Sequence, residues 1–198
     1  MLRIWKFENG NPYHNRAYDA CRRTANKLEE VKPDSDLTEK SFLQKDFGSP
    51  LFDKLPIEGA MIPIMQRRYK EAYNCLVGNS PLAVIILCGS ILEGILLGIA
   101  LKQPLKFTQS SAAPRDSKEN KVKPLEKWTL ENLINVSYNI SILGKDISKF
   151  SHALRDFRNY IHPYQQMSSQ FDPDKHTAKI CFQVLVAAIY DLSTTKLD

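Results

Sequence analysis

Hydrophobic residues recur at steps of three and four along much of the chain, which is the spacing of amphipathic helices. The clearest stripe begins near residue 62 and consists of Ile62, Met65, Tyr69, Ala72 and Leu76. Pro63 suits the first turn of a helix, and Gly78 suits the position just after its end. The pattern therefore predicts a helix over 62–78 with one face against a core.

The next segment, 82–101, is apolar on all sides and reads LAVIILCGSILEGILLGIAL. Ser80 and Pro81 are typical of a helix start, and Pro104 ends the run. The length would suit a bilayer. However, Glu93 lies at its middle, where a carboxylate in lipid costs about 2.5–3.5 kcal/mol. We expect a helix buried within a soluble bundle, with no membrane contact.

Three further helices are predicted from the remaining pattern. One starts near Thr129 and ends before Gly144, a second runs over 146–162 and stops at Pro163, and a third begins at Asp172-Pro173 and continues to Leu192. No segment shows the strict alternation of a half-buried strand. The sequence thus predicts an all-α fold, an up-and-down four-helix bundle over 61–198 with additions.

Residues 1–60 form a predicted N-terminal extension. Tyr18, Cys21, Ala25 and Leu28 predict one helix over 16–31, and the stretch 33–59 is polar and broken by Pro and Gly. Such an extension either wraps the core or contacts a partner.

The segment 103–127 is predicted to be a long loop without apolar periodicity. Residues 102–127 contain seven basic and three acidic side chains, a net +4 of the formal +5 of the whole chain. A solvated loop explains this charge, and so does an arm that binds a polyanion such as RNA. In the second interpretation, Lys118, Lys121 and Lys123 contact nucleic acid.

The four cysteines are widely separated, form no CxxC pair and have no histidine at zinc-ligand spacing. We therefore expect reduced thiols in a reducing compartment, the cytoplasm, and neither a metal site nor a cofactor.

The segment with the strongest chemical pattern is 146–163, DISKFSHALRDFRNYIHP. Its apolar stripe contains Phe150, Leu154, Phe157 and Ile161. Beside that stripe, on one helical face, lie Ser151, Arg155, Arg158 and His162. Cationic groups at the edge of a buried surface are costly unless an anion meets them. This face is therefore the candidate site.

The run RDFRNYIH at 155–162 resembles the HEPN superfamily (higher eukaryotes and prokaryotes nucleotide-binding), four-helix-bundle proteins with an Arg-x(4–6)-His motif. Six residues separate Arg155 from His162. Arg158 supplies the Arg-Asn pair with Asn159, but only three residues separate it from His162, one short of the usual range. Both arginines are candidates. SILEG at 90–94 resembles the Glu-bearing helix that pairs with the motif, and the likeness covers about 62–192.

The resemblance implies metal-independent RNA cleavage by a homodimer that brings two motifs together, in a bacterial defence or toxin–antitoxin setting. His162 would be the acid/base, and Arg155 or Arg158 the phosphate clamp. Asn159 would orient the imidazole or the substrate. Glu93 would pair with one arginine, and Ser151 is a further supporting residue on the same face.

A second interpretation is a non-catalytic HEPN-like module that binds a nucleotide or a partner protein. In this case, His162 caps the helix C-terminus through the helix dipole. Arg155 and Arg158 then simply pair with Glu93 and Asp156.

Overall fold

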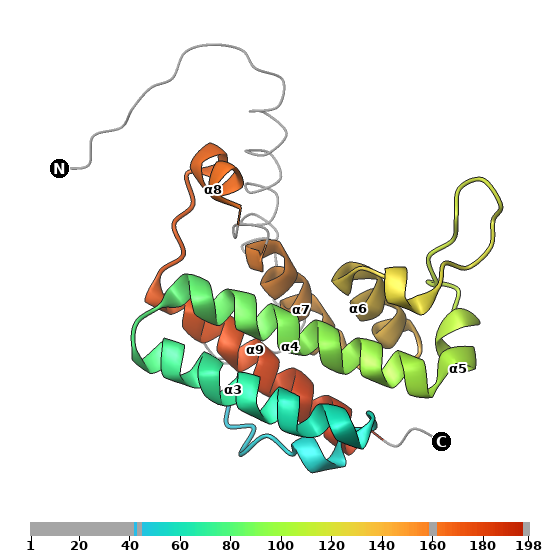
Figure 1. Ribbon diagram of the computed structural model, residues 1–198, viewed down its shortest axis with the longest axis horizontal. Helices are drawn as coiled ribbons and strands as arrows, with labels where there is room; N and C mark the ends of the chain where they lie inside the picture. Colours follow the sequence, from blue (N-terminus) through green and yellow to red (C-terminus); the bar gives the residue numbers. More distant parts are fainter. Residues whose placement is uncertain (1–41, 43–44, 159–161, 196–198) are drawn as a thin grey trace, which may run out of the picture.

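The computed structural model describes Phe42 and residues 45–158 and 162–195, and within these the chain is all-α (Figure 1). The described part contains no strand and only one isolated antiparallel bridge, between Arg115 and Val122. The predicted all-α class is confirmed. The predicted helix over 16–31 lies outside the described residues.

The described helices differ greatly in length. The long ones are α3 (Ile62–Val77), α4 (Pro81–Lys102), α6 (Leu130–Asn139), α7 (Lys145–Arg158) and α9 (Lys175–Thr194). The short α-helices are α5 (Pro104–Thr108) and α8 (Pro163–Ser169), and single 3-10 turns are η1 (Phe52–Lys54), η2 (Gly59–Met61) and η3 (Leu125–Lys127).

Helix α4 is the centre of the fold and packs against α3, α6, α7 and α9. Figure 1 shows that α3 is antiparallel to α4, that α9 runs in the same direction as α4, and that α7 is steeply inclined to these helices. Among the described helices, α4 alone is long and apolar enough to cross a bilayer, and 56% of its most apolar window is buried inside the protein.

Two glycines of α4 allow α3 and the segment before it to approach closely. A Cβ at Gly94 would lie 2.9 Å from Met65 Cε, and one at Gly98 would lie 3.0 Å from Ile57 Cγ2. A methyl group at either position would require Met65 or Ile57 to move. The glycine spacing in this apolar helix therefore serves packing within the chain.

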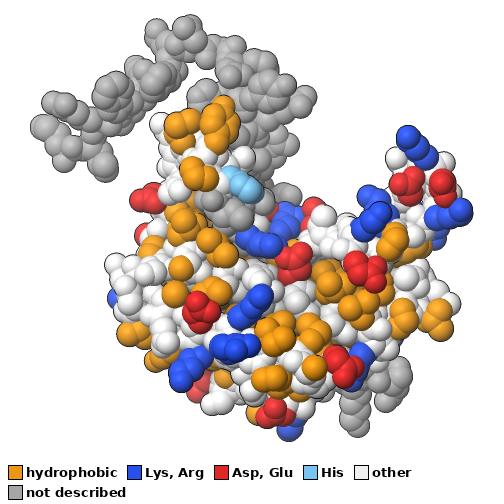
Figure 2. Space-filling view, in the orientation of Figure 1, with side chains coloured by type: hydrophobic (Ala, Val, Ile, Leu, Met, Phe, Trp, Pro, Cys, Tyr) orange, Lys and Arg blue, Asp and Glu red, His pale blue; other side chains and the backbone are white. Residues whose placement is uncertain are grey.

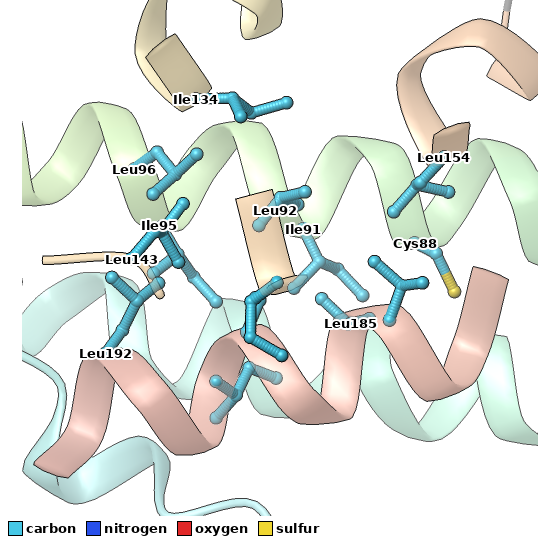
Figure 3. Packing of buried hydrophobic residues seen from close by; sticks show 14 of the residues in the cluster. Cys88, Ile91, Leu92, Ile95, Leu96, Ile134, Leu143, Leu154, Leu185 and Leu192 are labelled. Atoms are coloured by element: carbon cyan, nitrogen blue, oxygen red, sulfur yellow. The ribbon is translucent and has the colours of Figure 1, made fainter. Parts of the chain in front are cut away.

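The core is continuous across the described helices. Figure 3 shows side chains of α4 and α9, together with Leu143 and Leu154, pointing into one interior. Residues before α3 also take part, because Phe47, Phe52, Leu55 and Ile57 are buried in the same cluster. Phe42 is fully buried and stacks on Phe150 of α7. The described part of the N-terminal extension thus wraps the core.

The prediction of a loop throughout 103–127 was wrong near its start. Residues Pro104–Thr108 form α5, and the ring of Phe107 is completely buried. One turn of helix is too short to show periodicity, so the pattern could not reveal it. The bridge between Arg115 and Val122 then closes a hairpin-like turn, the basic hairpin of residues 115–122.

Several boundaries differ from the predictions. Helix α6 ends at Asn139, and its start is fixed by a capping box between Thr129 and Asn132. Helix α9 starts after Asp174, whose carboxylate accepts the Thr177 N–H at 2.8 Å, rather than at Asp172-Pro173. Pro163 was predicted only as the residue that stops a helix, but it is the first residue of α8, which was not predicted. Proline is tolerated in the first turn of a helix, so it can follow the end of one helix or begin another.

Candidate functional site

Helix α7 places the two candidate arginines by burying its opposite side. Ile147, Phe150 and Leu154 are buried against the core, and Arg155 and Arg158 lie in the last turn. The two guanidinium groups therefore emerge at the edge of the buried surface. Figure 2 shows basic and acidic side chains intermixed on this face rather than gathered in a positive patch.

Arg158 turns towards α4, where its Nη1 forms an ion pair with Glu93 Oε2. Glu93 was expected to pair with one arginine, and the structure identifies Arg158 as that residue. The side chains remain 33% and 32% exposed, so the pair is accessible to solvent. The aliphatic part of the Arg158 side chain passes over Gly89, where an added Cβ would lie 2.8 Å from Arg158 Cδ. The absence of a side chain at Gly89 therefore leaves the space through which Arg158 reaches Glu93.

Arg155 turns the other way, towards α6. Its Nη1 lies 2.8 Å from Glu131 Oε1, and its Nε donates to Asp156 Oδ1 at 3.0 Å. Burial disfavours the charged guanidinium, but the hydrogen bonds and charges of Asp156 and Glu131 outweigh it and raise the pKa of Arg155. The two arginines lie in the same turn of α7, but Arg158 pairs with a carboxylate of α4 and Arg155 pairs with a carboxylate of α6.

His162 lies outside α7. Its backbone is extended, with φ −86° and ψ 116°, and it occupies the position just before α8. The expectation that the helix includes His162 was wrong, because its backbone is extended and the residue directly precedes the N-terminus of α8. The residue is exposed, and its imidazole makes no hydrogen bond or ion pair with any residue that the structure describes.

Ser151 lies in the interior rather than on an accessible face. The side chain is completely buried, and its Oγ has no hydrogen-bond partner among the described residues. Helical spacing put Ser151 beside Arg155, but the packing of neighbouring helices on α7 decides which positions are covered. Asn159, the other polar residue of the motif, lies outside the described residues.

Two contacts near Arg158 had no clear sequence signal. Arg68 of α3 donates to Ser90 Oγ of α4 at 2.7 Å, one turn from Glu93. Phe171, which follows α8, stacks on Phe157 of α7 with ring centroids 5.5 Å apart. A pair of aromatic residues separated by a proline-led helix could have suggested the second contact, whereas the first depends on how α3 and α4 pack.

The three candidate lysines lie on or beside the basic hairpin. Lys121 pairs with Glu119 at 2.9 Å, and both side chains are largely exposed. The Lys118 and Glu119 N–H groups donate to Asp116, which lowers the pKa of that carboxyl. Figure 1 shows the hairpin projecting at the far end of α4 from α8. The structure does not bring these lysines together with His162.

The described residues include no group of three or more His, Cys, Asp or Glu side chains that could hold a metal ion. Cys75, Cys88 and Cys181 are free thiols. No protein-family model, curated protein or solved structure matches the chain.

Proposed function

We propose that the chain is a metal-independent RNA endonuclease of HEPN type. The observation that carries this proposal is the exposed imidazole of His162, four residues after the partly exposed guanidinium of Arg158. An imidazole that is exposed to solvent can exchange protons with a substrate near neutral pH. A guanidinium with unused donors can bind a phosphate oxygen.

In the proposed reaction, the RNA 2′-oxygen attacks the adjacent phosphorus and the bond from phosphorus to the 5′-oxygen breaks. A base removes the 2′ proton, and an acid protonates the leaving 5′-oxygen. His162 performs one of these transfers. The products are a 2′,3′-cyclic phosphate and a 5′-hydroxyl, so the step needs no metal or redox partner.

Arg158 is the better phosphate ligand of the two arginines. Its side chain has one carboxylate partner, Glu93, and is 33% exposed, whereas Arg155 has two carboxylate partners and is 24% exposed. Glu93 limits the positions of Arg158, and a phosphate would share or displace that contact. Arg155 then mainly joins α7 to α6. Asn159 remains a candidate for orienting the substrate.

The wider proposal includes the assembly. We infer that α3, α4, α7 and α9 correspond to the four helices of an up-and-down bundle, because each packs against at least one other in the set. A homodimer would place a second motif beside the first and supply a second His162. The lysines of the basic hairpin would hold RNA distant from the cleaved bond, and the protein would act in the cytoplasm in a bacterial defence or toxin–antitoxin setting.

The test is RNA cleavage by the full chain in EDTA, with His162→Ala, Arg158→Ala and Arg155→Ala as variants. We expect cleavage to persist with chelator and to fall about 10²–10⁴-fold in His162→Ala. His176→Ala, which removes another exposed histidine, is the matched control and should cleave as wild type. Cleavage that is equal in wild type and His162→Ala, or absent from wild type, contradicts the proposal.

One observation favours the alternative, a non-catalytic HEPN-like module that binds a nucleotide or a partner protein. Both guanidinium groups already have carboxylate partners within the chain, so an anion has to compete with Glu93 or with Glu131 and Asp156. In that case, binding of a nucleotide or partner is measurable by calorimetry while RNA remains intact at every enzyme concentration.

A further inference from the structure

Helix α8 is unusual because it buries nothing. It is the one α-helix in the described part of the chain without a buried residue. Tyr164 and Met167 stand three positions apart, on one face, and are 72% and 66% exposed. Figure 2 shows hydrophobic side chains gathered on this projection.

A helix of seven residues is not stable by itself in water, because nucleation costs more than so few hydrogen bonds return. The described contacts hold its ends rather than its apolar face. Gln166 Nε2 donates to Asp172 Oδ1 at 2.8 Å, and Phe171 stacks on Phe157 just beyond the helix. The Tyr164 and Met167 face is therefore left uncovered by the described residues.

The first described residue, Phe42, lies against α7, the helix that precedes α8. Phe42 stacks on Phe150 of α7 with ring centroids 4.1 Å apart. Gln183 of α9 donates to the Lys45 carbonyl at 2.6 Å, which ties Lys45 to α9. From Phe150 to Arg158, the axial distance along α7 is only about 12 Å.

The chain before Phe42 contains one amphipathic stripe, formed by Tyr18, Cys21, Ala25 and Leu28. Residues 32–41 connect this stripe to Phe42, and ten extended residues reach up to about 33 Å. The stripe can therefore reach α8. The tether also gives it a far higher effective concentration at α8 than a separate protein has.

We propose that residues 16–31 dock through this stripe onto the Tyr164 and Met167 face of α8 in the same chain. The inference does not depend on RNA cleavage, because it rests on the uncovered face and the tether alone.

The test uses Cys21 as a built-in probe. In a Cys75→Ser background, Met167→Cys adds an exposed thiol on α8, while Cys88 and Cys181 stay buried. A diazene oxidant takes two electrons and two protons from a thiol pair and leaves a disulfide. We expect an intramolecular bond between Cys21 and position 167, identified by peptide mass, and Tyr164→Cys should behave in the same way.

The control is Tyr138→Cys, an exposed position on α6. The bond to position 167 should form at least about tenfold faster than the bond to position 138, and Cys21→Ser should abolish it. Equal rates at the two positions overturn the proposal. A disulfide between two chains would instead identify a second copy as the occupant, and no disulfide at 164 or 167 would exclude contact with Cys21. Either result overturns it as well.

Discussion

Replacing Gly89 by alanine tests the packing that brings Arg158 to Glu93. The added Cβ would lie 2.8 Å from Cδ, 3.5 Å from Cγ and 3.6 Å from Nε of Arg158. These atoms belong to the middle of the side chain, so rotation of the end cannot relieve the clash. The guanidinium has to leave its present position, and the ion pair with Glu93 is lost.

Two opposing effects set the magnitude. Alanine is favoured over glycine inside a helix by about 1 kcal/mol. Against this, the partly exposed ion pair contributes up to about 1 kcal/mol, and a displaced side chain costs about 0.5–1.5 kcal/mol. In wild type, the effect of Gly89→Ala should therefore lie between a stabilisation of about 0.5 kcal/mol and a destabilisation of about 1.5 kcal/mol. When Arg158 is already alanine, the same substitution should stabilise by about 1 kcal/mol.

The assay is a double-mutant cycle of Gly89→Ala and Arg158→Ala, with free energies of unfolding from urea titrations. We expect a coupling energy of about 0.5–2.5 kcal/mol between the two positions, from the sum of the ion-pair and rotamer costs. Gly98→Ala is the matched control, since its Cβ would meet Ile57 and Met61 rather than Arg158. If Gly89→Ala is equally stabilising in both backgrounds, the Arg158 stem does not cross Gly89.

Three further predictions concern stability and reactivity. Leu96→Ala, at a fully buried position of α4, should lower the free energy of unfolding by about 2–5 kcal/mol, and a loss below 1 kcal/mol in urea titrations would contradict its burial. The hydrogen bond from the Thr177 N–H holds the pKa of Asp174 below its usual value. The carboxylate therefore stabilises the fold above about pH 4, and this contribution disappears on acidification. The difference in free energy of unfolding between wild type and Asp174→Asn should accordingly shrink from pH 7 to pH 3. Burial raises the pKa of Cys88 and Cys181, so a thiol reagent should label both at least about tenfold more slowly than Cys75 in the folded protein, and equal rates would count against the buried cluster.

The long helices could be predicted because their signals are local. Helical periodicity and flanking prolines give α3 and α4 almost to the residue, since these features act within one turn. Helix α8 is too short for periodicity, and Pro163 marks equally well the end of one helix and the start of another. The position of His162 outside α7 depended on that ambiguity.

The candidate site was only partly predictable for a different reason. A carboxylate in an apolar helix needs a cationic partner, so the pairing of Glu93 with an arginine followed from sequence. Which arginine it is depends on the gap above Gly89, a feature of how α4 and α7 pack. The divergence of Arg155 towards Glu131 likewise depends on where α6 lies.

Trp128 gives the basic hairpin an optical reporter. The indole is 4% exposed, donates through Nε1 to the Lys123 carbonyl at 2.8 Å, and lies near the ring of Phe107. The chain has only two tryptophans, and the other is Trp5. With Trp5 replaced by phenylalanine, emission from a single fluorophore would register any event that lifts this arm from the helical body, including the arrival of a nucleic acid.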